Sequence, residues 1–303
     1  MPAARDKMKI LNKDLRIIYL IAVPVAVALL CLTGSGWMAV ARNIVFLISV
    51  WYLYDLLSGI SAPGRVAFWI TLLYSLFPLI EGWNNCIQTE SLACSISVLL
   101  IWDFRSLTER MSWRSFLPFV CLLDLLVFIS PLQFYYLPVF LVVFACLSFV
   151  KRSRAAGLLG LAGTLLVTAI WVLSPAFPGV VDQFAAGSGQ GQGIKFMTHT
   201  GYYRLFNWIA GPLLEPVSIK FSEIYSVALV FFIVMCFRTV KGGRVPWLGI
   251  TIVALLTANV LASVFFLPDD YGRFVLPSVP LWLLMLGYIL SRIRLNYSNP
   301  ELV

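Results

Sequence analysis

Polar side chains suited to catalysis are concentrated in one short segment, EGWNNCIQTE, which lies between two long apolar runs. It carries two carboxylates, Glu81 and Glu90, and three amides, Asn84, Asn85 and Gln88. Glu90 is followed at once by the apolar run SLACSISVLLIW, which places its carboxylate at or just below a membrane surface. An ionised carboxylate at that depth is costly and requires a partner or a water-filled cavity. We therefore expect a catalytic or substrate-binding hairpin here, the alternative being an ordinary polar turn.

A second polar cluster, PDDYGR, directly precedes the last apolar run, FVLPSVPLWLLMLGYIL. It contains Asp269, Asp270 and Arg273. A guanidinium group at a membrane surface can grip a phosphate with two parallel hydrogen bonds. Arg273 is therefore a candidate phosphate ligand, and the two acids are candidate catalytic groups. The alternative is an arginine that reaches lipid phosphates or pairs with one of the neighbouring acids.

The third polar segment is the connection at about 177–222, which is longer than every other connection in the chain. Long connections in compact proteins are usually functional or disordered. Its glycine stretch, GSGQGQG, lacks the Lys-Ser/Thr of a phosphate-binding loop, which favours a flexible hinge. The following KFMTHTGYYRLFNW is typical of a short amphipathic helix at a membrane interface. Its candidate substrate-binding residues are Lys195, His199, Tyr202 and Arg204.

Metal and cofactor chemistry is not expected. The six cysteines include no CxxC pair, and nearly all of them fall inside apolar runs, where a thiol behaves as a small hydrophobic group. We predict no metal site, no disulfide framework and no bound cofactor.

The composition predicts an integral membrane protein. Hydrophobic residues make up 60% of the 303 residues and charged residues 12%, and the mean hydropathy is +0.90. Soluble domains are about half apolar and about a quarter charged. The net charge of +8 does not indicate nucleic-acid binding, because most Lys and Arg residues lie in short loops between apolar runs. Basic loops of this kind set membrane topology and attract anionic lipid headgroups.

The apolar runs predict an all-α, polytopic membrane helix bundle that forms one domain over residues 1–303. The basic N-terminal segment is interpreted as the start of a retained signal anchor. The ten predicted spans are 17–33, 43–60, 66–82, 88–103, 116–130, 132–150, 156–176, 223–239, 246–267 and 274–291.

Charge asymmetry predicts the orientation of these spans. With both termini in the cytoplasm, 17 of the 22 Lys and Arg residues fall on the cytoplasmic side and 5 outside. The positive-inside rule supports this topology and an even number of spans. Only Asp55 and Asp124 then lie deep in spans. The lack of long hydrophilic domains is typical of a bacterial inner membrane protein.

Two regions resemble multi-pass GT-C glycosyltransferases, the protein mannosyltransferase and aminoarabinose transferase relatives in particular. The first comprises ARNIVFLISVWYLYDLL and LLYSLFPLIEGWNNCIQTESLACSISVLLIW, with matches at Arg42, Pro78, Thr89 and Glu90. The second is DDYGRFVLPSVPLWLLMLGYIL, which is similar to the R-[FY]-x-x-P-x-x-P span near the end of these enzymes, with matches at Arg273, Pro277 and Pro280.

The resemblance implies transfer of a sugar from a polyprenyl-phosphate carrier to an extracytoplasmic glycan, lipid or protein. Arg273 would then bind the phosphate with help from Lys195 or Arg204, and Glu90 would orient substrate. The family's catalytic Asp lies in a large first extracytoplasmic loop, but the corresponding residues 34–42, GSGWMAVAR, contain no acid. Glu81, Asp269 or Asp270 would have to replace it, unless the sequence lacks its beginning or the protein is not catalytic.

Two other functions remain open. A transporter or lipid-translocating protein would need a polar pathway through the bundle, for which Asp124 is the candidate. A non-catalytic subunit of a glycan-assembly complex would explain the missing acidic loop. Membrane lipids are expected partners in every case, and a glycosyltransferase would also bind a polyprenyl-phosphate sugar. No nucleic-acid partner is expected.

Overall fold

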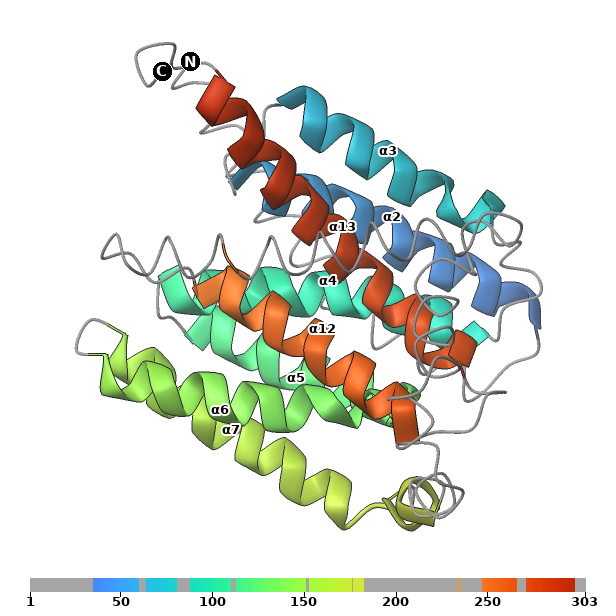
Figure 1. Ribbon diagram of the computed structural model, residues 1–303. Helices are drawn as coiled ribbons and strands as arrows, with labels where there is room; N and C mark the ends of the chain where they lie inside the picture. Colours follow the sequence, from blue (N-terminus) through green and yellow to red (C-terminus); the bar gives the residue numbers. More distant parts are fainter. Residues whose placement is uncertain are drawn as a thin grey trace.

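The fold is known from a computed structural model, which describes residues 35–59, 64–80, 88–109, 113–150, 153–175, 177–182, 234, 247–265 and 271–297. These residues are almost entirely helical, which confirms the all-α prediction (Figure 1). The helices are α2 (Ser35–Gly59), α3 (Gly64–Ile80), α4 (Gln88–Glu109), α5 (Trp113–Ile129), the 3-10 helix η1 (Pro131–Tyr135), α6 (Tyr136–Phe149), α7 (Arg154–Val172), α12 (Trp247–Phe265) and α13 (Tyr271–Tyr297).

Eight of the ten predicted spans correspond to helices in the described part of the chain. The other two, 17–33 and 223–239, lie outside the described residues. The break predicted near Pro131 is present, because α5 ends at Ile129 and the proline begins η1, where its missing N–H leaves no helical partner unsatisfied.

Two predicted boundaries are wrong. The short loop expected at 34–42 is helical from Ser35 onward, because α2 continues beyond the apolar run that marked the span. The helix expected to end at 103 continues to Glu109, since charged residues at its end do not stop a helix. The connection predicted at about 177–222 includes a short helical segment, 177–182, and its later residues lie outside the described part of the chain.

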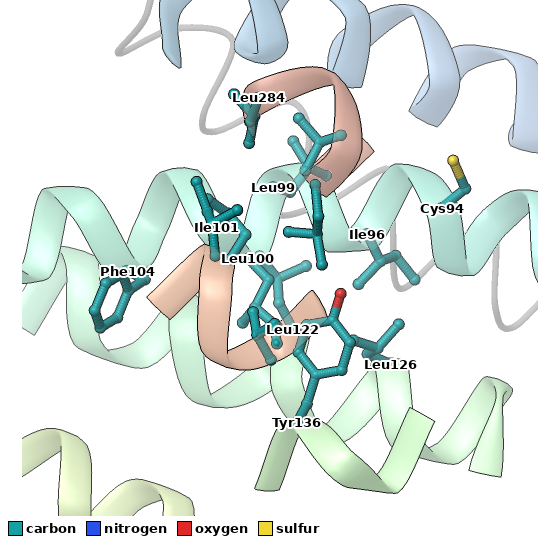
Figure 2. Packing of buried hydrophobic residues seen from close by; sticks show 14 of the residues in the cluster. Cys94, Ile96, Leu99, Leu100, Ile101, Phe104, Leu122, Leu126, Tyr136 and Leu284 are labelled. Atoms are coloured by element: carbon teal, nitrogen blue, oxygen red, sulfur yellow. The ribbon is translucent and has the colours of Figure 1, made fainter. Parts of the chain in front are cut away.

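Helix α4 lies at the centre of the bundle. Every side chain from Leu92 to Ile101 is buried, which is the pattern of a helix that is covered on all sides. It packs against α2, α5 and α13. Figure 2 shows this core, in which Leu99 and Leu100 of α4 meet Leu122 of α5 and Leu284 of α13.

Small residues allow α7 to approach α6 closely. Gly157 and Gly160 are buried where α7 meets α6, and Gly163, which is also buried, faces α5. A Cβ atom at Gly160 would overlap the ring of Phe144, and one at Gly157 would overlap the backbone at Ser148. Close approach through small residues is the usual way in which helices pack within a membrane.

Two helical stretches of the described chain are long and apolar enough to cross a membrane, Pro131–Phe149 and Arg154–Val172. The second of these also carries exposed apolar side chains along one side, among them Leu158, Leu165 and Ile170. Large exposed apolar faces on a helix mark contact with lipid or with another protein.

The helices alternate in direction, so that the chain crosses the bundle repeatedly (Figure 1). Helices α2, α4 and α13 begin at the end of the bundle on the right of Figure 1, and α3, α5 and α12 end there. We call this end the Glu90 end, because Glu90 lies in the first turn of α4. Helices α3, α5 and α7 begin at the opposite end.

Candidate functional site

The structure brings the beginnings of the two helices that carry the main predicted site residues to one end of the bundle. Gln88 and Glu90 lie in the first turn of α4, and Arg273 lies in the first turn of α13. The two helices pack against each other, and both begin at the Glu90 end (Figure 1). Positions that are 183 residues apart in the sequence are therefore at the same end of two neighbouring helices.

The remaining predicted site residues lie outside the described residues. This holds for both carboxylates of the second cluster and for all candidates in the long connection. They are Glu81, Asn84, Asn85, Lys195, His199, Tyr202, Arg204, Asp269 and Asp270.

A layer of buried polar side chains lies below the Glu90 end. Tyr74, Cys94 and Asn259 are each six residues from the end of their helix at this side, or roughly 9 Å along the axis. Each of these side chains is completely buried. The layer, called the polar layer below, consists of Ser49, Tyr74, Cys94, Ser97, Gln133, Tyr135, Tyr136 and Asn259.

One part of the polar layer connects α2, α3 and α4. The Ser49 hydroxyl donates to the carbonyl of Phe46 at 2.7 Å, and its oxygen lies 3.0 Å from the Tyr74 hydroxyl. Because Ser49 has only one hydroxyl proton, Tyr74 must be the donor to Ser49. The sulfur of Cys94 lies 3.8 Å from the Tyr74 oxygen, so its thiol donates to that oxygen.

The other part connects α12 and α6 with α4. Asn259 Nδ2 donates to the Tyr135 hydroxyl at 2.7 Å, and Tyr135 donates to Gln133 Oε1 at 2.6 Å. The adjacent Tyr136 hydroxyl donates to Ser97 Oγ at 3.2 Å. Figure 2 shows the Tyr136 oxygen directed toward α4. These bonds satisfy polar groups that would otherwise be costly to bury.

The polar layer consists of hydroxyl, thiol and amide groups. These groups can hold the helices in register. They are poorly suited to acid–base chemistry themselves, so we assign them to positioning. The sequence contains one signal for this layer: single hydroxyl and amide residues occur in several apolar runs at a similar distance from the same end.

The acidic residues of the spans are placed differently from one another. Asp55 on α2 accepts a hydrogen bond of 2.8 Å from Trp102 Nε1. Asp103 is completely buried, which sequence reasoning missed because the fourth span was expected to end at this residue. Asp124 is only half-buried and lies on the outward side of α5, one turn from the exposed Cys121. Asp124 is therefore not an interior group.

No cluster of three or more His, Cys, Asp or Glu residues that could hold a metal ion occurs in the described part of the chain. Comparison of the sequence and the structure with known protein families, curated proteins and solved structures gives no match.

Proposed function

We propose that the chain is a polytopic membrane protein with about ten transmembrane helices and both termini in the cytoplasm. The apolar composition, the two helical stretches of membrane-spanning length and the exposed apolar side of α7 support this setting. The distribution of basic residues supports the orientation, with exposed arginines Arg65, Arg114 and Arg154 at the starts of α3, α5 and α7. The Glu90 end would face the extracytoplasmic side of a bacterial inner membrane.

In this setting we propose a GT-C-like glycosyltransferase, or a shortened relative, that uses a polyprenyl-phosphate-linked sugar. The observation that carries the proposal is the common location of the first turns of α4 and α13, which hold Glu90 and Arg273. Helix N-termini carry partial positive charge, which favours a phosphate group near two such ends. A lipid-linked donor is confined to the membrane surface where this end would lie.

The proposed reaction divides the work between a general base and a cation that stabilises negative charge. A carboxylate takes the proton of the acceptor hydroxyl while the hydroxyl oxygen bonds to the anomeric carbon of the sugar. The bond between that carbon and the carrier's phosphate oxygen breaks, and Arg273 stabilises the negative charge left on the phosphate. Glu90 is the first candidate for the carboxylate, followed by Glu81, Asp269 and Asp270.

The test measures sugar transfer from a polyprenyl-phosphate donor by the protein reconstituted in lipid vesicles. Glu90→Ala and Arg273→Ala are expected to lower kcat by about 100-fold or more, the usual loss for a group that stabilises a transition state. Arg273→Lys should recover only part of the activity, because lysine cannot make the bidentate contact. Arg65→Ala, at the opposite end of the bundle, is the matched control. Unchanged turnover in both alanine variants would eliminate the proposed site.

A second candidate is a non-catalytic subunit of a glycan-assembly complex. It is favoured by the helical conformation of residues 35–42, where the family resemblance implies a large acidic loop. This candidate predicts that the purified chain transfers no sugar and that the Glu90 and Arg273 variants still assemble normally. The transporter hypothesis receives less support, because Asp124 lies on the outward side of α5.

A further inference from the structure

The outward side of α5 presents one line of residues at alternating spacings of three and four. Leu117 and Phe128 are 62% and 67% exposed, and Cys121 between them is also exposed. Arg114 extends the line toward the start of the helix, and Asp124 occupies its remaining position. This is the spacing of a seam that packs against a second helix. We call these five residues the α5 stripe.

Asp124 is the unusual member of the α5 stripe. It lies five residues before the end of α5, or roughly 8 Å along the axis, and so falls within the apolar part of a membrane span. Within the described part of the chain, its carboxylate forms no hydrogen bond or ion pair. A carboxylate exposed to lipid at this depth is costly, and such groups normally pair with a donor.

In the two predicted spans outside the described residues, the single cation is Arg238, near the end of 223–239. The sequence contains no Lys, Arg or His from 17 to 33 or from 224 to 237. Neither these two stretches nor the described residues give Asp124 a cationic partner, which favours a partner from another molecule. A single polar residue in a helix seam also fixes the register and the identity of the partner helix.

From these observations we propose that the α5 stripe docks a transmembrane helix of another protein, which carries a Lys, Arg or His side chain at the depth of Asp124. The inference rests on the membrane setting proposed above and is independent of sugar transfer. Charge complementarity disfavours a second copy of this chain, because a symmetric contact through α5 would bring two Asp124 carboxylates together.

The test uses synthetic transmembrane peptides as probes and the full chain in lipid vesicles. One peptide is an apolar helix with a single central Lys, and its control has Leu at that position. Binding is measured by energy transfer from the labelled peptide to a fluorophore on α6, attached at Cys146 in a variant in which the other cysteines are Ser. We expect the Lys peptide to bind about tenfold more tightly than the Leu peptide, the size of effect found for polar contacts between membrane helices.

Three variants test whether Asp124 causes the preference for the Lys peptide. Asp124→Asn should remove the preference for the Lys peptide, whereas Asp55→Asn should retain it, because Asp55 is already bonded to Trp102. Asp124→Lys should reverse the preference toward a peptide with a central Asp. Equal binding of both peptides to the starting protein, or a preference that survives Asp124→Asn, would overturn the proposal.

Two further measurements would detect other occupants of the α5 stripe. Detection of either occupant would overturn the docking proposal. Oxidative cross-linking of Cys121 between two copies would show a homodimer. Protection of Cys121 from a membrane-soluble maleimide in the monomeric chain would show that the chain's own residues cover the stripe. Since neither measurement involves sugar transfer, loss of the docking proposal leaves the proposed enzyme function to its own test.

Discussion

The amide nitrogen of Asn259 lies 2.7 Å from the phenolic oxygen of Tyr135, although 124 residues separate them in the sequence. This bond ties α12 to the turn that begins α6. It therefore links the helix that leads to Arg273 with η1, which is followed directly by Tyr136, the residue that bonds to Ser97 of α4. The proposed catalytic residues Glu90 and Arg273 lie at helix starts. The hydrogen bonds between uncharged side chains of the polar layer fix the positions of the helices relative to one another.

The Tyr135–Asn259 bond should contribute measurably to stability. Tyr135→Phe and Asn259→Leu are each expected to destabilise the protein by about 0.5–2 kcal/mol, because each leaves a buried polar group without its partner. Their coupling energy in a double-mutant cycle should be about 0.5–1.5 kcal/mol. Unfolding in mixed micelles with increasing denaturing detergent measures all four proteins. Tyr54→Phe is the control, since the Tyr54 hydroxyl has no hydrogen bond within the described residues. A coupling energy of zero would mean that the bond does not link the two helices.

Close packing of α6 and α7 predicts that the added methyl group of Gly157→Ala is destabilising. Its Cβ would overlap the backbone of Ser148 and lie 2.7 Å from the carbonyl carbon of Leu147, and backbone atoms cannot move aside as a flexible side chain can. We expect a loss of about 1–3 kcal/mol, typical of overpacking. Gly64→Ala is the control, because nothing lies within 4 Å of its added Cβ. If both variants unfold at the same detergent concentration, the close contact between α6 and α7 is not present.

The exposed side of α7 distinguishes a membrane protein from a soluble one. Leu165 is 52% exposed near the middle of the helix, whereas Ala155 is exposed at its start. In a bilayer, Leu165→Arg should cost about 2.5–3.5 kcal/mol of insertion free energy, and Ala155→Arg far less because it can reach the headgroups. An insertion assay that scores glycosylation tags on either side of α7 measures both variants. In water both substitutions would be harmless, so efficient insertion of Leu165→Arg would contradict the membrane setting of α7.

Sequence reasoning located the helices because long apolar runs are a strong, local signal. The existence of eight predicted spans as helices follows from that signal, whereas the break at Pro131 follows from the proline itself. Helix ends are less predictable, since the apolar runs predict boundaries at Arg42 and Asp103, although a helix can carry charges beyond its apolar part. The buried location of Asp103 was missed for the same reason.

The candidate site was predictable only in part. The apolar runs after Glu90 and Arg273 indicate that both precede or begin a helix, and the alternation of spans places them on one side. The sequence gives no means of pairing Tyr135 with Asn259 or Tyr136 with Ser97, because these contacts depend on which helices are neighbours. The outward position of Asp124 depends on the same information, since the sequence shows an acid in a span but not the side of the bundle that it faces.

The proposed site requires that Glu90 and Arg273 face the outside of the cell, and cysteine labelling measures this. In a variant without native cysteines, single cysteines replace Glu90, Arg273, Arg65 or Arg154 one at a time, and intact cells are treated with a membrane-impermeant maleimide. In the proposed topology, Glu90→Cys and Arg273→Cys are labelled from outside, and Arg65→Cys and Arg154→Cys are labelled only after permeabilisation. Labelling of either Glu90→Cys or Arg273→Cys solely from the cytosol would contradict it.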